Sequence, residues 1–422
     1  FASGNPIRYT PPNILIFLMD DMGIGDCKVY NPECKVILPN LEKLAETGMV
    51  FTDAHAPAAV CAPTRYSILT GNYPWRGRNE NGTWLFHMPS QILKGQKTLG
   101  HLMKQAGYNT AFLGKVHLGG TIYSKSTGKP KRNLKDGFRD FDFSRKIENS
   151  PASLGFDYAY EFPQGIQGSP YIAIENGKLV GKESELKAWK AGTYKNSIIE
   201  SDGFGSPDWD SSKAGPILTQ KALNYIRRHI AQNKKSSIRK PFFMHYCSQS
   251  CHVPHTPPIE IAGRKIKGTA LDSHLDMLVE ADATLGLLME ELKRHGELEN
   301  TLILFTSDNG GLARGPVGKP NLGHNSNAGL RGSKAQIYEG GHRVPFIVSW
   351  GNGKKNSPIQ PGSQSSALVG LQDLFATFSE LSAQSVGLKD ALDSQSFLGI
   401  LLGKEKSKER STLLLQANNG KF

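Results

Sequence analysis

Carboxylate and amide side chains directly follow two apolar runs of this sequence. Asp20 and Asp21 follow the first run, and Asp308 and Asn309 follow the other after a single serine. Such oxygen donors suit a hard cation such as Ca²⁺ or Mg²⁺, and the set lacks the thiolate and imidazole ligands that zinc prefers. One such pair alone is more often a helix cap or a turn, but two matched pairs favour a metal site.

A further candidate is the string CAPTR, which runs from Cys61 to Arg65. Pro63 and the apolar spacing after it predict that Cys61 lies at or just before the start of a helix, where free backbone N–H groups favour an anion. Arg65 lies about one turn further on, so its guanidinium is placed to bind the same anion through two hydrogen bonds. An isolated cysteine is usually a small buried apolar residue, whereas this setting predicts an anion site.

These side chains need a scaffold that brings the ends of strands together. The apolar runs that predict buried strands, because they lack polar alternation, cover residues 13–19, 110–113, 241–246 and 301–306. The helical patterns that fall between them cover residues 38–48, 98–107, 215–233 and 272–296. Strands that alternate with helices predict an α/β fold with a mostly parallel sheet, in which ligands collect beyond the carboxyl ends of the strands.

Polar residues also follow the two remaining strands. Lys115 and His117 come after the second strand, and His252 comes shortly after the third. Taken singly, His117 would be interpreted as a structural histidine, and Lys334, further along the chain, as a solvated surface charge. Because strand ends meet at one edge of a parallel sheet, we expect Lys115, His117 and His252 to lie near the oxygen donors.

Several strings in the same order along the chain resemble the type I sulfatases of the alkaline phosphatase superfamily. The string CAPTR, followed by LTG, resembles the signature in which the cysteine is oxidised after translation to formylglycine. The other matching strings are LMDDMG (18–23), GKVHLG (114–119), HVP (252–254), TSDNG (306–310), GSK (332–334) and YEGG (338–341). The resemblance implies an alkaline-phosphatase-like α/β fold, with a catalytic domain over residues 1–390 and the start of an incomplete C-terminal subdomain at 391–422.

The resemblance also implies a metal centre and a modified nucleophile. Asp20, Asp21, Asp308 and Asn309 would bind one calcium ion, with matured Cys61 beside it as a further ligand. A formylglycine-generating enzyme would be the partner during maturation. The hydrated aldehyde would attack sulfur with one hydroxyl and form a sulfated enzyme intermediate.

The same resemblance assigns roles to the remaining polar residues. Arg65, Lys115 and Lys334 would spread the charge on the sulfate oxygens. His252, with or without Lys334, would protonate the leaving alcohol oxygen, and His117 would deprotonate the second hydroxyl to expel sulfate.

Three more residues are candidates for binding the substrate. His255 shares a His-x-Pro context with His252, but the spacing from the preceding strand favours His252 as the family histidine. His255 therefore contacts the substrate in one interpretation and is a simple loop histidine in the other. The Gly-rich stretch at 310–332 is predicted to be an active-site loop, and it contains the other two candidates, Arg314 and His324.

Charge narrows the class of partner. The chain has 422 residues and a net charge of +12, from 50 Lys and Arg against 38 Asp and Glu, which favours anionic partners. Zinc-finger spacings, a basic heptad region and an Arg-rich RNA signature are absent from the sequence, which argues against nucleic acid. With a basic stretch at 121–148, predicted to be a surface insertion, the balance favours a sulfated polysaccharide, either an algal galactan such as carrageenan or a glycosaminoglycan. The alternatives are a phosphonate or phosphate ester hydrolase of the same superfamily and an inactive glycan-binding relative.

Location is predicted from the chain start and the cysteines. No apolar stretch reaches the roughly 18 residues that a membrane helix needs, so we expect no membrane span. A start at Phe1 without an initiator methionine fits an exported protein, periplasmic or secreted, with a lysosomal setting as the alternative. Export would allow Cys27 to pair with Cys34 and Cys247 with Cys251, leaving Cys61 single; otherwise all five are free buried thiols.

Overall fold

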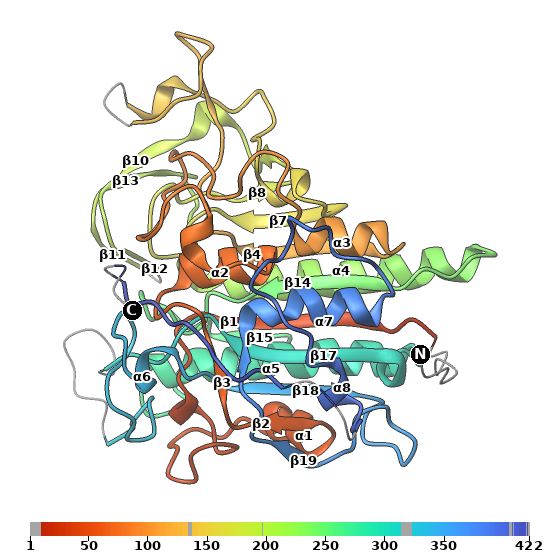
Figure 1. Cartoon of the computed structure of the whole chain (residues 1–422). Helices are drawn as coiled ribbons and strands as arrows, with labels where there is room; N and C mark the ends of the chain where they lie inside the picture. Colours follow the sequence, from red (N-terminus) through yellow and green to blue (C-terminus); the bar gives the residue numbers. More distant parts are fainter. Residues whose placement is uncertain are drawn as a thin grey trace.

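The computed structural model describes residues 10–133, 137–195, 197–313, 323–404, 407, 409–418 and 420. Within these residues a large sheet runs through the middle of the protein, with helices on both faces (Figure 1). Its strands, in spatial order, are β19 (Ser363–Ser365), β2 (Met49–Phe51), β18 (Phe346–Trp350), β17 (Thr301–Ser307), β1 (Asn13–Met19), β14 (Phe242–Cys247), β4 (Asn109–Lys115), β7 (Tyr158–Phe162), β8 (Ile174–Glu175) and β9 (Lys178–Leu179).

The middle of this sheet is parallel. β17, β1, β14, β4 and β7 pair in parallel, whereas β18 runs antiparallel to β17. Near the carboxyl ends, Leu18 of β1 is level with Thr306 and Cys247 on its two neighbours. Every residue of β1, β14 and β17 is buried, which explains the uninterrupted apolar runs. The four predicted strands are confirmed, and their ends meet at one edge.

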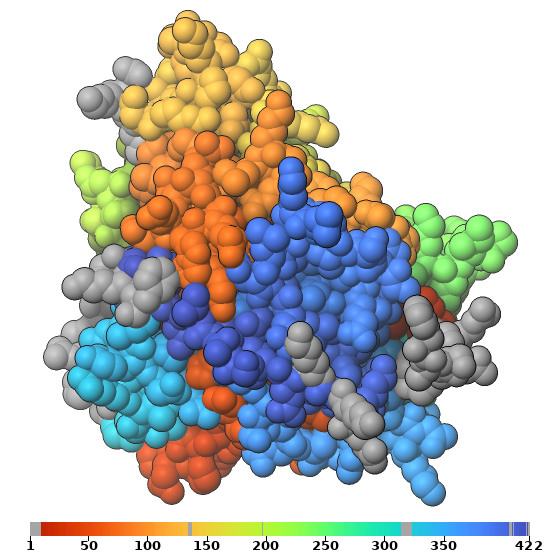
Figure 2. Space-filling view, in the orientation of Figure 1, coloured from red at the N-terminus to blue at the C-terminus, as the bar shows by residue number. Residues whose placement is uncertain are grey.

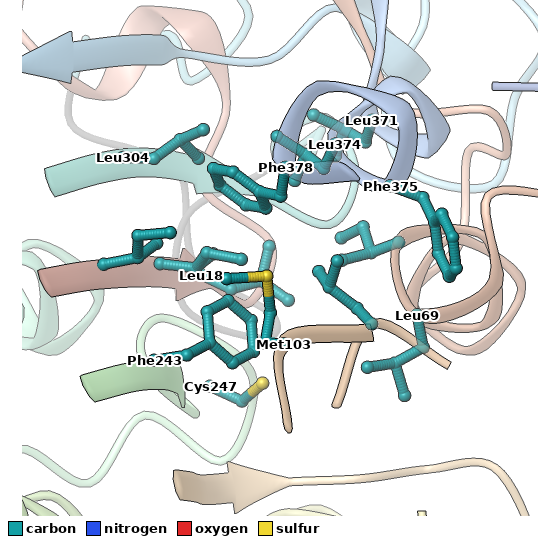
Figure 3. Packing of buried hydrophobic residues seen from close by; sticks show 14 of the residues in the cluster. Leu18, Leu69, Met103, Phe243, Cys247, Leu304, Leu371, Leu374, Phe375 and Phe378 are labelled. Carbon is teal, nitrogen blue, oxygen red and sulfur yellow. The ribbon is translucent and has the colours of Figure 1, made fainter. Parts of the chain in front are cut away.

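Two layers of helices cover the sheet because alternate residues of each strand point to opposite faces. The helices on one face are α1 (Pro39–Glu46), α4 (Ala214–Lys235) and α5 (Ser273–Arg294). Those on the other face are α2 (Cys61–Thr70), α3 (Leu99–Gln105) and α7 (Leu374–Leu381). Figure 3 shows the second core, where Met103 of α3 and Phe378 of α7 lie near Leu18 and Phe243 of the strands, and Leu69 of α2 lies nearer to Phe375 of α7. The helices predicted at 38–48, 98–107, 215–233 and 272–296 are confirmed.

A smaller core lies above the main sheet in the view of Figure 1, and it refines one prediction. The described parts of the predicted surface insertion at 121–148 expose most of their Lys and Arg side chains, as expected, but Ile122, Phe141 and Phe143 are buried with Phe86 and Phe204 in a separate cluster. The remaining described strands and helices are β3 (Ala54–His55), β5 (Tyr123–Ser124), β6 (Phe141–Asp142), β10 (Lys187–Trp189), β11 (Gly192–Tyr194), β12 (Ser197–Ile199), β13 (Gly203–Gly205), β15 (Glu260–Ile261), β16 (Arg264–Lys265), β20 (Val369–Gly370), α6 (Glu339–His342) and α8 (Leu398–Leu401).

The C-terminal segment packs on the main body. The Phe397 ring lies 5.7 Å from those of both Phe51 and Phe346. Gln416 exchanges backbone hydrogen bonds with the stretch just before α2, since its carbonyl accepts from Ala59 N at 2.8 Å. Figure 2 shows these dark blue residues lying between the orange and cyan parts of the surface. The division of the chain at residue 390 stays a prediction.

Two further predictions concern membranes and cysteines. Among the described residues, no helix has the length and apolar character required to cross a membrane. Cys27, Cys34, Cys61, Cys247 and Cys251 are all buried free thiols in the structure. The structure therefore has the free-thiol arrangement rather than the two local disulfide pairs.

Candidate active site

The four predicted oxygen donors lie together at the edge of the sheet. Asp20 and Asp21 follow β1, and Asp308 and Asn309 follow its parallel neighbour β17. The backbone N–H of Asp21 donates to Asp308 Oδ1 at 3.2 Å, and the Asn309 amide nitrogen donates to Asp21 Oδ1 at 2.9 Å. All four side chains are fully buried. Parallel pairing thus brings together residues that are almost 290 positions apart.

This cluster fits a hard divalent cation. Carboxylate oxygens of Asp20 and Asp308 and the Cys61 Sγ atom all lie within 4.8 Å of one another. Taking such charges out of water costs several kcal/mol for each ion unless positive charge compensates it. Asn309 Oδ1 is buried and, among the described residues, has no hydrogen-bond partner, so a bound cation would satisfy it. Three carboxylates and one amide oxygen are the ligand types that Ca²⁺ prefers.

Two buried cationic side chains form ion pairs with these carboxylates. Lys115, at the end of β4 and fully buried, donates from Nζ to both oxygens of Asp20 at 2.7 and 3.0 Å. Arg65 contacts Asp308 Oδ2 through Nε at 2.9 Å and through a terminal nitrogen at 2.7 Å. Burial by itself would raise the pKa of Asp20, but Lys115, His252 and Arg65 outweigh it and hold that pKa well below its usual range. Asp20 is therefore an anion in the folded protein.

Cys61 is the first residue of α2, as the sequence predicts. Val60 before it is extended, and no acidic side chain occupies the first turn, so the helix N-terminus is available to an anion. The Cys61 side chain is buried, and its Sγ lies 3.4 Å from His117 Nδ1. Burial raises the pKa of the thiol above its usual value, despite the nearby Lys115 and Lys334. An unmodified Cys61 is thus a protonated thiol, which is a poor nucleophile.

His117 is placed to accept a proton beside Cys61. It follows Lys115 after β4 with a positive φ of 56°, and its Nδ1 atom contacts Cys61 at the start of α2. Burial, together with Lys115 and Arg65, holds the pKa of His117 well below its usual value. A neutral imidazole at this position can act as a base toward a group on Cys61.

His252 forms a unit with Lys334. The His252 Nδ1 atom is 2.7 Å from the carbonyl oxygen of Val253, so Nδ1 carries the proton of the neutral ring. Its other nitrogen, Nε2, accepts from Lys334 Nζ at 2.9 Å, and Lys334 also donates to Asp21 at 2.7 Å. Burial and the Lys334 charge lower the pKa of His252 to about 4. The Lys334 ammonium therefore donates an N–H group to neutral His252, and the Asp21 carboxylate, which raises the pKa of Lys334 despite burial, fixes its position.

A surface cavity of about 550 Å³ opens onto these groups. Cys61, His117, His252 and Lys334 form its floor, whereas Lys115 and Arg65 lie beneath. The walls contain polar residues that the sequence did not single out, namely Thr83, His87, Gln164, Gln167, Ser169, Ser201, Asp202 and Asn418. Gln164 follows the parallel strand β7. Had residues 158–162 been predicted as a strand, Gln164 would have been a candidate, because polar residues after parallel strands meet at one edge of the sheet. None of the others directly follows a predicted strand.

Two of the three predicted substrate-binding residues, His255 and His324, lie outside the cavity. His255 Nε2 is 3.1 Å from the Cys251 carbonyl oxygen, and its ring stacks on His274 at 5.1 Å. His324 is buried and bonds to Asp26 Oδ1 at 2.7 Å. Neither side chain lines the cavity, since both are engaged in contacts behind it. Arg314 lies outside the described residues.

Comparison with known proteins identifies the class. The sulfatase family model matches residues 12–383. An N-acetylgalactosamine-6-O-sulfatase of Bacteroides thetaiotaomicron is 31% identical over 97% of this chain and 80% of its own length. The human N-acetylgalactosamine-6-sulfatase is 27% identical over 95% of this chain and 67% of its own length. The chain therefore belongs to the sulfatase family, which makes it a sulfuric ester hydrolase.

Solved structures agree on the fold. A structure from Bacteroides thetaiotaomicron, whose title concerns the metabolism of multiple glycosaminoglycans, matches with a TM-score of 0.81 and 29% identity over 98% of this chain and 85% of that one. A phosphonate monoester hydrolase of Agrobacterium radiobacter matches with a TM-score of 0.55 and 18% identity over 94% of this chain and 79% of that one. The second match concerns the fold alone. The predicted alkaline-phosphatase-like fold is confirmed.

Proposed function

We propose that this protein removes sulfate esters from a sulfated glycan, with a formylglycine derived from Cys61 as the nucleophile and one calcium ion as cofactor. The observation that carries the proposal is the position of Cys61. It begins a helix, lies 3.4 Å from a neutral histidine, and shares a 4.8 Å cluster with Asp20 and Asp308. Because its own thiol is protonated by burial, a modified side chain suits this site better than a thiolate.

Positive charge around the sulfate is one contribution of the chain itself. The α2 N-terminus and Lys334 face the cavity, and Lys115 and Arg65 lie directly behind the carboxylates. Fixed charges in a site of low polarity stabilise the charge that develops on sulfate oxygens in the transition state. Calcium, held by Asp20 and its partners in the oxygen cluster, would add a further positive charge at the same place.

Proton transfer is the other contribution. The hydrated aldehyde would supply the oxygen that attacks sulfur. We assign His252 and Lys334 to the leaving oxygen, because the Lys334 ammonium and the His252 Nε2 atom share one proton across 2.9 Å at the cavity floor. We assign His117 to the nucleophile side, because its Nδ1 atom contacts Cys61 and its ring is neutral. The acid and the base thus lie on different elements that face one site.

The proposed substrate is a polyanionic glycan. The net charge of +12 favours an anionic polymer, and the cavity walls offer amides and a carboxylate, from Gln164, Gln167 and Asp202, for sugar hydroxyl groups. The bacterial relative at 31% identity is named for 6-O-sulfated N-acetylgalactosamine. Of the two polymers considered, this relation favours a glycosaminoglycan over an algal galactan. Such a role fits an exported protein that meets a formylglycine-generating enzyme during maturation.

Two rival functions remain to be separated from this one. A phosphonate or phosphate ester hydrolase would use the same kind of site, and a glycan-binding relative would bind without turnover. We would release sulfate from chondroitin sulfate, carrageenan and 6-sulfated N-acetylgalactosamine, beside phosphate from matched phosphate esters. Cys61→Ala would abolish turnover, whereas Cys34→Ala, at another buried free cysteine, would retain it. Faster phosphate than sulfate release would support the rival hydrolase, and tight binding without release would support the binding protein.

A further inference from the structure

Two buried histidines face each other outside the lining of the active-site cavity, and the proposed reaction uses neither. His55 lies on β3 and His342 ends α6, and their exposed fractions are 4% and 2%. Backbone hydrogen bonds hold the two segments together, from Ala56 N to His342 O at 2.8 Å and from Val344 N to Ala54 O at 3.1 Å. The two Nδ1 atoms are only 3.0 Å apart.

Hydrogen-bond partners fix what these facing nitrogens carry. His55 Nε2 is 2.9 Å from Asp53 Oδ1, and His342 Nε2 is 3.0 Å from the Ile337 carbonyl oxygen. Both partners are acceptors, so each Nε2 must carry the proton of its ring. The two Nδ1 atoms of neutral rings then present lone pairs to each other at 3.0 Å. Such contact is repulsive unless a cation or an extra proton lies between them.

The surroundings favour a metal ion over a proton. One carboxylate oxygen of Glu339 and one ring nitrogen of each histidine all lie within 4.8 Å of one another, so a third ligand is at hand. Metal-binding histidines typically donate their other N–H group to a carboxylate or a backbone carbonyl, as His55 and His342 do here. Two nitrogens 3.0 Å apart can both be reached by one Zn²⁺ ion at its usual distance of about 2.0–2.1 Å.

We propose that His55, His342 and Glu339 form a zinc site that is separate from the calcium cluster. Two imidazoles and one carboxylate suit zinc, whereas the four oxygen donors of the other cluster suit calcium. The positive charge of Arg343 would repel a cation at this site. Two carboxylates already neutralise that charge, since Arg343 forms ion pairs with Glu339 at 3.1 Å and with Asp53 at 3.4 Å.

Its place in the fold gives the zinc a structural role. His55 lies six residues before Cys61, and His342 lies eight residues after Lys334. The ion would therefore fasten the segment that leads to the nucleophile to the segment that carries Lys334. A backbone bond from Ala335 N to Ala59 O at 2.7 Å joins the same two segments closer to the cavity.

The test is metal analysis of the full chain, purified without a histidine tag, loaded with calcium and then dialysed against zinc. We expect one equivalent of zinc in the parent protein, lost in His342→Gln while calcium is retained. His295→Gln, at a histidine that ends α5 and contacts Glu291, is the matched control and should keep its zinc. Cys251→Ser probes another imidazole-containing cluster, formed by Asp26, Cys251 and His274, and should also keep its zinc.

A second measurement covers the case in which His342→Gln does not fold. Cobalt added to the parent protein in place of zinc should give visible absorption bands typical of nitrogen and carboxylate ligation, and zinc should displace them. The proposal is overturned if the folded parent protein binds neither ion, if His342→Gln retains its zinc, or if zinc is lost from Cys251→Ser instead. Because this test reads metal content, its failure leaves the sulfatase proposal untouched.

Discussion

His252 is the residue whose role can be measured most sharply, because its partners separate acid catalysis from mere positioning. Its Nε2 atom accepts from Lys334 at 2.9 Å, and its Nδ1 atom is held by the Val253 carbonyl oxygen. In His252→Gln the side chain can no longer pass a proton to the leaving oxygen. Loss of a general acid typically costs about 10²–10⁴-fold, so we expect kcat/KM on a sugar sulfate to fall by that factor, or about 3–5 kcal/mol.

The assay compares two leaving groups. A sugar alkoxide needs protonation as it leaves, whereas a nitrophenolate leaves without it. We therefore expect His252→Gln to lose far less activity on a nitrophenyl sulfate than on a sugar sulfate. His255→Gln tests the other histidine of the pair and should retain most activity, because its ring stacks on His274 outside the cavity. Calcium content and the melting temperature show that each variant is folded. Equal losses on both substrates would refute the assignment of His252 as the acid.

Three further predictions concern stability and metal binding. Glu280 is buried, and burial raises its pKa to about 8 from 4.5. Between these two pH values the folded protein keeps a proton that the unfolded chain releases, so the free energy of unfolding falls as pH rises from 4.5 to about 8. Glu280→Gln should remove this loss and raise unfolding free energy at pH 8 by up to about 4–5 kcal/mol, with little gain below pH 4.5, as urea titrations would show. Asn309→Leu should weaken calcium binding, seen as a smaller rise in melting temperature when calcium is added. Phe141→Ala should cost about 3–5 kcal/mol in urea unfolding by opening a cavity in the upper core.

The central fold and the floor of the site could be predicted from the sequence for a physical reason. Strands buried on both faces have no polar alternation, and polar residues at their ends must meet at one edge of a parallel sheet. Asp20, Asp308 and Lys115 were found in this way, and all three lie in one cluster of ion pairs. Lys334 belongs to no strand end, and only its motif indicated it.

Other parts carried no comparable signal. The upper core is built on two- and three-residue strands, such as Phe141–Asp142, that are too short to show a period. Its aromatic residues are scattered among charged ones, so the sequence of the stretch at 121–148 predicted a surface position but not the burial of Ile122, Phe141 and Phe143. The contact between His55 and His342 joins residues 287 positions apart. The backbone hydrogen bonds between the two segments bring these residues together, and the sequence carries no sign of them.

The central claim is that Cys61 becomes the aldehyde that attacks sulfur. The most direct measurement is mass spectrometry of the tryptic peptide at residues 44–65, made on preparations with different degrees of maturation, beside sulfate release from each. We predict that the peptide carries an aldehyde in place of the thiol, and that sulfate release rises in proportion to the aldehyde fraction. Sulfate release from protein with only the thiol, or none from protein that carries the aldehyde, would contradict the account.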